Sequence, residues 1–161
     1  MLGNSECSGI QIQSGGLDEP VVQQLLREHL RSMGDHSPPE SIHALDLSAL
    51  QHPNVSFWSV WREGDLLGCG ALKELDRVHG EIKSMRTVEA YLRQGVAAAI
   101  LEHIIDEGRC RGYQRLSLET GSADAFQPAQ RLYAKYGFDY CDPFADYVDD
   151  PYSVFMTRTL K

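Results

Sequence analysis

Residues 92–99 have the composition of a phosphate-binding loop. Gly95 lies directly before an alanine-rich helical run, and a glycine at such a junction lets the backbone approach a ligand closely. The first turn of a helix offers unpaired N–H groups and the positive end of the helix dipole, which together bind phosphate or pyrophosphate, and Arg93 adds a cation. The same residues could also form a plain connection between a strand and a helix. The sequence contains neither G-x-x-x-x-G-K-[ST] nor G-x-G-x-x-G, so it does not indicate a nucleoside triphosphatase or a dinucleotide-binding fold.

The elements that must position this loop follow from the spacing of the apolar residues. Alternating and apolar runs predict strands at 10–13, 55–62, 66–75, 79–88, 115–119, 138–141 and 152–160. Helical spacing predicts helices at 20–33, from 39 to about 45, at 95–111 and at 125–136, with Gly34 as the end of the first. Short turns join the three runs between 55 and 88, so we expect an antiparallel meander there. The whole order predicts a single α/β domain over 1–161, with 1–9 as a loose leader and helices covering a central sheet.

The composition limits the class of partner. A formal net charge of −8 disfavours nucleic acid and an anionic membrane surface, because both require a basic face. The longest apolar run is far short of the ~20 residues that a membrane span needs, and we expect no secretory signal. The cysteines and histidines show no zinc-ligand spacing, so we expect no metal, and free thiols in a reducing cytoplasm.

Three segments together resemble the GNAT superfamily of N-acetyltransferases. They are residues 81–87 (EIKSMRT), 93–97 (RQGVA) and 131–138 (RLYAKYGF). The first two resemble motif A of the superfamily and the third resembles motif B; the chain is also similar to the small bacterial group of the YsnE type within it. The resemblance covers roughly residues 55–160. It implies the GNAT fold, with a mixed, mostly antiparallel central sheet of about six or seven strands flanked by about four helices. It further implies transfer of an acetyl group from acetyl-CoA to an amine by direct attack.

The resemblance also implies which residues bind acetyl-CoA and which act on it. Backbone groups of the strand ahead of the loop would bind the pantetheine arm, and a backbone N–H near Met85 would hold the oxyanion. Backbone N–H groups of the loop would hold the pyrophosphate. The implied cofactor-binding residues are Met85, Arg86, Thr87, Arg93, Gln94, Gly95, Val96, Ala97 and Ala98. Tyr133 matches the motif B tyrosine and would protonate the departing CoA thiolate as general acid, although a tyrosine on an apolar helix stripe is more often part of the core.

The general base is open between two carboxylates and a water molecule. Glu81 lies where the family often places a base, acting directly or through water, and Glu119 on the next strand is the second candidate. The chain departs from the family at Leu92, where Arg or Gln is usual, and at Phe126, where Asn is common. No cysteine lies beside a histidine and an acid in a way that would support an acyl-cysteine route.

The acceptor that we expect is the primary amine of a small molecule. A protein or peptide amine is the alternative acceptor, and a non-catalytic acyl-CoA-binding sensor is the alternative from another functional class; Tyr133 favours the enzyme. An acidic stretch borders the acceptor site in this fold, and a solvated loop is the better interpretation of it than recognition of a cationic amine. Its residues are Asp139, Asp142, Asp146, Asp149 and Asp150. Dimers are common in the superfamily, so the resemblance allows a homodimer.

Overall fold

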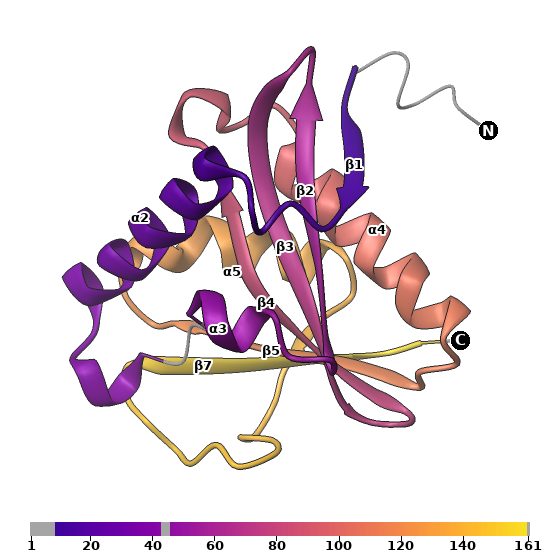
Figure 1. Cartoon of the computed structure of the whole chain (residues 1–161). Coiled ribbons are helices and arrows are strands. Elements are labelled where there is room, and N and C mark those ends of the chain that lie inside the picture. Colours follow the sequence, from indigo (N-terminus) through magenta and orange to yellow (C-terminus); the bar gives the residue numbers. More distant parts are fainter. Residues whose placement is uncertain (1–8, 43–45, 161) are drawn as a thin grey trace.

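The computed structural model describes residues 9–42 and 46–160 and shows a twisted sheet between two layers of helices (Figure 1). The seven strands of this sheet are hydrogen-bonded in the order β1-β2-β3-β4-β5-β7-β6. The strands are β1 (Gln11–Ser14), β2 (Val55–Arg62), β3 (Asp65–Asp76), β4 (His79–Thr87), β5 (Arg115–Gly121), β6 (Asp139–Tyr140) and β7 (Ser153–Thr159). The α-helices in the described part of the chain are α2 (Pro20–His36), α3 (Leu47–Leu50), α4 (Val96–Cys110) and α5 (Gln127–Lys135). Short 3-10 turns lie at η1 (Pro39–Ser41), η2 (Glu89–Tyr91) and η3 (Asp124–Phe126).

The expected meander forms from β2, β3 and β4, which pair antiparallel in sequence order. The tight turn between β2 and β3 uses Glu63 and Gly64, whose φ angles of 52° and 84° lie in the left-handed region that hairpin turns require. The connection from β4 through α4 to β5 instead returns the chain to the same end of the sheet, so β5 pairs parallel with β4. All other strand pairs in the described chain are antiparallel, which confirms the mixed, mostly antiparallel sheet.

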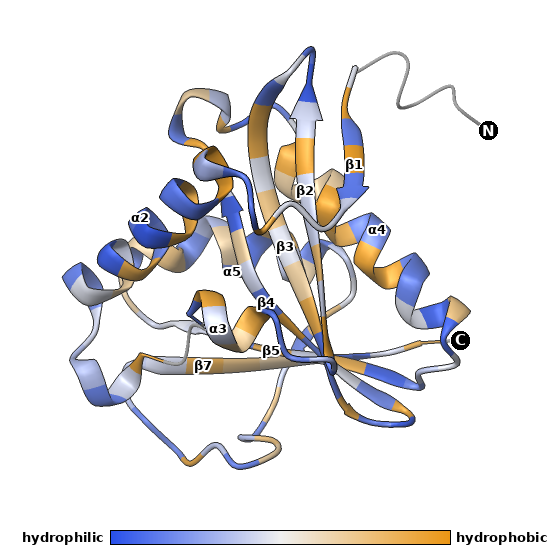
Figure 2. Ribbon diagram, in the orientation of Figure 1, coloured by the Kyte–Doolittle hydropathy of each residue, from blue (hydrophilic) through white to orange (hydrophobic). Residues whose placement is uncertain are grey.

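The two faces of the sheet carry separate apolar clusters. The α4 and α5 face contains Ile100, Ile104 and Tyr133 against the strands, whereas the α2 and α3 face contains Leu25 and Leu50. Figure 2 shows the corresponding alternation of apolar and polar stripes along α2 and α4. Helix α4 approaches the sheet closely, and one mid-sheet glycine on β3 permits this approach. Any Cβ on Gly70 would lie 2.6 Å from Ile100 Cγ2.

Several boundaries differ from the sequence-based expectations. Gly34 does not end the first helix, which continues to His36, and nothing lies within 4 Å of where a Cβ on that glycine would be. The second helix, expected from Pro39, is only the 3-10 turn η1, and the rest of that expectation falls on residues 43–45, outside the described residues. The short helix α3 was not expected; its N-cap is Asp46, whose Oδ1 accepts a hydrogen bond from the Ala49 N–H (2.8 Å).

Two other expectations concern the ends of the chain and its environment. The leader expected at 1–9 falls almost entirely on residues 1–8, outside the described residues, and the extent of the single domain stays a prediction. Across residues 9–42 and 46–160, no helix has the length and apolar character needed to cross a membrane.

Candidate active site

The parallel strands β4 and β5 separate from one another halfway along their length. They pair from His79↔Arg115 to Ile82↔Leu118 and no further, although β4 continues to Thr87 and β5 to Gly121. Beyond Ile82, the edge of β4 that faces β5 therefore has no strand bonded to it. Such an edge can accept an extended chain as an added strand.

A β-bulge lies at the point where the strands separate. Cys69 of β3 pairs with Arg86 and Ala71 pairs with Lys83, so Gly70 alone faces two residues of β4. The first of them, Ser84, has a φ of 55°, which is uncommon for a residue with a side chain. The bulge redirects the backbone of β4 immediately before Met85. The predicted cofactor-binding residues Met85, Arg86 and Thr87 thus lie on the free part of this strand.

The loop between η2 and α4 presents a row of free backbone donors. No backbone N–H from Arg93 to Ala98 donates a hydrogen bond within the described chain, and the first that does is Ala99, to the Gly95 carbonyl (3.0 Å). Arg93 and Gly95 have φ angles of 65° and 84°, and alternation of this kind turns successive N–H groups toward a common point. These donors coincide with the N-terminus of α4, so the geometry fits a phosphate or pyrophosphate group. The predicted residues Arg93, Gln94, Gly95, Val96, Ala97 and Ala98 are all brought together here.

A cation that the sequence did not single out lies beside this loop. Arg62, at the end of β2, donates through Nη2 to Gln94 Oε1 (2.8 Å) and lies 5.8 Å from the centre of the Tyr91 ring. Arg93 itself is exposed. The two guanidinium groups give an acidic chain a local positive charge at the helix N-terminus. The proximity of Arg62 to this loop follows from the tertiary structure, because the two are distant in sequence.

Tyr133 lies on the α4 and α5 side of the sheet. Its side chain is 6% exposed, and its ring packs edge-on against Phe138 at 5.8 Å. Burial raises the pKa of the Tyr133 hydroxyl above its ordinary value, so the hydroxyl keeps its proton at neutral pH. Helix α5 is fixed to the end of β5 by Gln130, whose Nε2 donates to the Gly121 carbonyl (2.8 Å). The tyrosine therefore carries a buried, neutral hydroxyl on a helix anchored to the end of β5.

Glu81 lies on the opposite face, within a buried network of hydrogen bonds. Its Oε2 accepts from Lys83 Nζ (3.1 Å) and from the Tyr147 hydroxyl (2.6 Å), and Lys83 Nζ also donates to that hydroxyl (2.9 Å). The side chains of Glu81 and Lys83 are 3% and 7% exposed. Burial and the nearby Glu81 charge raise the pKa of the Tyr147 hydroxyl. The position of Lys83 beside Glu81 could be predicted, since residues two apart on a strand share a face. Nothing in the sequence indicates that Tyr147 joins them.

Glu119, the second carboxylate, lies on the same face of the sheet as Glu81. Glu81 pairs with Ser117 across the two strands, and Glu119 follows two residues later, after the strands have separated. The charge of Glu119 contributes to the raised pKa of Tyr147, which places the two groups near one another. The carboxylates of both strands thus face the space covered by the loop that carries Tyr147.

The loop before β7 carries exposed acids and two half-buried aromatic residues, Phe144 and Tyr147. Asp139, Asp142, Asp146 and Asp149 are exposed, as a solvated loop predicts. Asp150 is half-buried and accepts through Oδ2 from the Ser41 hydroxyl (2.5 Å), which ties this loop to η1. The aromatic residues turn inward instead, with Phe144 at 5.1 Å from the Tyr147 ring.

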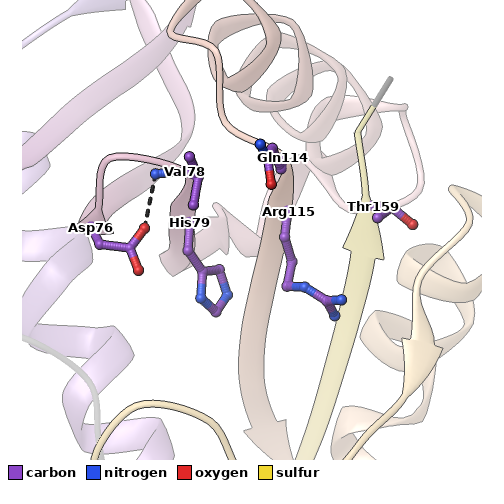
Figure 3. A pocket seen from close by; sticks show the side chains of 6 residues that line it. All are labelled: Asp76, Val78, His79, Gln114, Arg115 and Thr159. Atoms are coloured by element: carbon purple, nitrogen blue, oxygen red, sulfur yellow. Dashed lines mark hydrogen bonds between the residues drawn. The ribbon is translucent and has the colours of Figure 1, made fainter.

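Two surface hollows lie away from these groups. One of about 210 Å³ lies at the start of β4 and β5 and is lined by Asp76, Val78, His79, Gln114, Arg115 and Thr159 (Figure 3). A second of about 470 Å³ lies beside it, along β3 and the loop at Ala145 and Asp146. Neither includes Tyr133 or the loop before α4, so the candidate site is identified from its chemistry instead.

The remaining groups to consider in the described chain are possible metal ligands and the cysteines. No group of three or more His, Cys, Asp or Glu side chains between residues 9–42 and 46–160 could hold a metal ion. Cys69, Cys110 and Cys141 are free thiols. Burial raises the pKa of the Cys69 thiol to about 12, so this cysteine is not a thiolate at neutral pH.

Comparisons with known proteins agree with this geometry. The model of the Acetyltransferase (GNAT) family matches residues 22–138. The chain belongs to this family and is an acyl-CoA-dependent acetyltransferase. Within the family it is of the YsnE type, since it is 61% identical over 139 residues to the uncharacterized N-acetyltransferase YsnE of Bacillus subtilis, covering 86% of this chain and 92% of that protein.

Two further comparisons extend this result. The uncharacterized N-acetyltransferase YedL of Escherichia coli is 52% identical over 149 residues, which cover 92% of this chain and 94% of that protein. A GNAT family acetyltransferase from Elizabethkingia anophelis, solved with acetyl-CoA bound, superposes with a TM-score of 0.68 at 18% identity, covering 94% of this chain and 99% of that one. The solved structure supports the fold, and the sequence relatives support the family.

Proposed function

We propose that this protein is an N-acetyltransferase that moves an acetyl group from acetyl-CoA to the primary amine of a small molecule by direct attack. The observation that carries the proposal is the row of free N–H groups from Arg93 to Ala98 beside the unpaired part of β4. The row suits the pyrophosphate of a coenzyme A thioester, and the free strand edge suits its pantetheine arm. Both lie on one continuous segment of chain, as a single extended donor would require.

The roles of the residues follow from this arrangement. Backbone N–H groups at Arg93–Ala98 would hold the pyrophosphate, with Arg62 and Arg93 supplying positive charge. Backbone groups at Met85–Thr87 would bind the pantetheine arm. The N–H near Met85 would also stabilise the oxyanion of the tetrahedral intermediate, because the bulge at Ser84 directs the backbone toward the gap between the strands.

The reaction itself needs only proton transfers from this chain. The amine nitrogen forms a bond to the thioester carbonyl carbon, and the collapse of the intermediate breaks the bond between that carbon and sulfur. Tyr133 would donate its proton to the departing thiolate and regain one from solvent. A buried hydroxyl that keeps its proton at neutral pH is suited to this role.

The base that accepts the amine proton is Glu81 in this proposal, directly or through a water molecule. Two donors, Lys83 Nζ and the Tyr147 hydroxyl, already occupy its Oε2, which favours the route through water. Glu119 is the competing candidate, because it lies on the same face beyond the point where the strands separate. Glu119→Gln and Glu81→Gln variants distinguish them: the true base should show the greater loss of kcat, and its loss should shrink at high pH, where the amine is already deprotonated.

The proposed setting and the alternatives rest on fewer observations. We place the reaction in the cytoplasm, where the free thiols of Cys69, Cys110 and Cys141 would be maintained. A protein or peptide acceptor and a non-catalytic sensor remain the alternatives to test. The homodimer that the resemblance allows also stays a prediction.

The proposal is tested by thermal shift with acetyl-CoA, followed by an amine panel that detects free CoA thiol. Acetyl-CoA should raise the melting temperature of the wild type, because a ligand bound only by the folded state stabilises it. Tyr133→Phe should keep this shift but lose most thiol release, by roughly 10²-fold. Tyr136→Phe, on the same helix with its hydroxyl bonded to Glu102, is the matched control and should keep turnover. An absent shift with acetyl-CoA would remove the basis of the proposal.

A further inference from the structure

Arg86 is a half-buried cation with no anionic partner in the part of the chain that the structure describes. It pairs with Cys69 across β3 and β4, so its side chain lies on the face that α2 covers. Its Nε is buried without a hydrogen-bond partner, and its guanidinium forms no ion pair with any residue in 9–42 or 46–160. Lys83, three residues earlier, shows the contrast, because its buried charge is paired with Glu81. Charged groups are seldom withdrawn from water without a partner.

Two neutral polar groups on the same two elements, α2 and β4, are also without a partner among the described residues. His29 and Ser84 are each 7% exposed, and the buried atoms His29 Nδ1 and Ser84 Oγ have no partner. His29 continues the helical stripe of Val22, Leu25 and Leu26, which points toward the sheet. The positive charge of Arg86 acts on His29, which indicates that the two side chains are close. We refer to Arg86, His29 and Ser84 as the Arg86 cluster.

The unsatisfied atoms of the Arg86 cluster require an explanation. A buried polar group left unbonded costs free energy, and native proteins contain few of them. Three such groups on two neighbouring elements, with one permanent positive charge and hydrogen-bond donors among them, form a partial shell for a small anion. A guanidinium presents a planar fork of donors that matches a carboxylate.

The donor substrate does not account for this shell. The free N–H groups that suit its phosphates lie at the N-terminus of α4, on the other face of the sheet from α2. A second substrate must reach the gap between β4 and β5 from the α2 face, where Glu81, Lys83 and Glu119 also lie. Arg86 therefore lies on the face from which the acceptor would approach, and not on the face where the donor phosphates would bind.

We propose that the acceptor amine carries a carboxylate, and that the Arg86 cluster binds it. This inference rests on the proposed function and adds the substrate class. Arg86 would form the charge-assisted contact, with His29 and Ser84 contributing hydrogen bonds. Arg86 follows Met85 directly, so the carboxylate would lie only a few bonds from the amine that attacks the thioester. The acceptor is thus an amino acid or a close relative, with its amino group directed toward the acidic side chains Glu81 and Glu119.

The test compares matched amines that differ only in the acidic group. Each amino acid of the standard set is assayed for thiol release beside its carboxamide and its decarboxylated amine, with aminosulfonates and aminophosphonates as further arms. The best carboxylate should exceed its amide by about 30-fold or more in kcat/KM, as expected when one partner of a buried charge pair is removed. Equal turnover of amide and acid would overturn the proposal, and a preference for phosphonate or sulfonate would overturn the choice of carboxylate.

Variants locate the effect at Arg86. Arg86→Gln should abolish the preference for the acid while the melting-temperature shift with acetyl-CoA persists, and Arg86→Lys should restore part of it. Arg77→Gln, at an exposed arginine in the turn that joins the same two strands, is the control and should keep the preference. If Arg86→Gln retains the wild-type preference, the assignment to this residue is wrong.

A binding measurement tests the carboxylate site separately from the proposed acetyltransferase function. The same acids and amides are added at saturating CoA, and the shift in melting temperature is recorded for the wild type and Arg86→Gln. A shift specific to acids and lost in the variant supports the carboxylate site even if no amine is turned over. Where acetyl-CoA binds but no acid stabilises more than its amide, the carboxylate site is refuted and the proposed function survives. Where acetyl-CoA gives no shift, the proposed function fails, and the acids and amides are then compared in the absence of CoA to decide on the Arg86 cluster.

Discussion

The buried histidine of α2 makes the stability of the fold depend on pH in a way that can be calculated. The pKa of His29 falls from 6.5 to about 4, first because burial disfavours the imidazolium and second because Arg86 repels it. His29 is thus neutral in the folded protein at pH 5, whereas the same residue in the unfolded chain is largely protonated. Folding stability contributed by this residue is complete above pH 6.5 and is lost as the pH falls toward 4.

The magnitude follows from the two pKa values. Between pH 7.5 and pH 5 the unfolded chain binds nearly one additional proton at this position and the folded chain binds almost none. That difference lowers the free energy of unfolding by about 2 kcal/mol. His29→Gln keeps a polar side chain that cannot be protonated. Between pH 7.5 and pH 5, the free energy of unfolding of this variant should therefore fall by about 2 kcal/mol less than that of the wild type. The comparison between variants cancels the titration of the carboxylates, which both proteins share.

The assay is urea unfolding at a series of pH values, followed by tryptophan fluorescence. Trp58 is 5% exposed and Trp61 is partly buried, so unfolding should change the emission of both. His52→Gln, at an exposed histidine, is the control and should show the pH dependence of the wild type. If the wild-type and His29→Gln curves run parallel, His29 is protonated in the folded state, and the reasoning about an enclosed Arg86 cluster is refuted.

Three further predictions follow from the same structure. Gly95→Ala should lower the free energy of unfolding by about 1 kcal/mol, because its φ of 84° is unfavourable for alanine, and isothermal titration should show weaker acetyl-CoA binding; unchanged affinity would contradict the role of this backbone. Gly70→Val should cost about 1–3 kcal/mol or prevent folding, since its side chain would collide with Ile100, and a melting temperature equal to the wild type would show that α4 can move away. Glu81→Gln should cost about 3–5 kcal/mol by leaving Lys83 as an unpaired buried charge, whereas the double variant with Lys83→Met should recover much of this loss; additive effects in the double-mutant cycle would argue against coupling.

The strands and the loop before α4 could be predicted from the sequence because local patterns determine them. The run from Val55 to Arg62 alternates and ends at a turn containing Gly64, and the structure has a strand with the same bounds. The loop at Gly95 is likewise a local feature, since a glycine before a helix determines where free N–H groups occur. The helix ends were less accurate. Gly34 was expected to end the first helix, but a glycine alone does not stop a helix. No neighbouring group around Gly34 prevents the helix from continuing.

The groups on the α2 face of the sheet could not be predicted, because these residues meet only through tertiary packing. Tyr147 comes from an irregular loop and reaches Glu81, which is distant in sequence. His29 lies on a helical stripe that reads as core, and only the absence of a partner for its Nδ1 distinguishes it from a satisfied core residue. Arg86 was placed among the cofactor-binding residues for its backbone, and the position of its side chain emerged only from the pairing register of β3 and β4.

Net charge illustrates why local placement outweighs composition in this protein. A charge of −8 suggests a cationic or neutral partner, and yet both substrates proposed here carry negative groups. The excess acids along the loop before β7 are exposed to solvent, where water and salt screen them. Arg62 and Arg93 instead lie beside the free backbone donors of the loop before α4. We therefore expect acetyl-CoA to respond to this local positive charge rather than to the sum of charges. Raising the ionic strength should accordingly change acetyl-CoA affinity in the direction of weaker binding, and an affinity that increases with salt would show that the net negative charge governs the site.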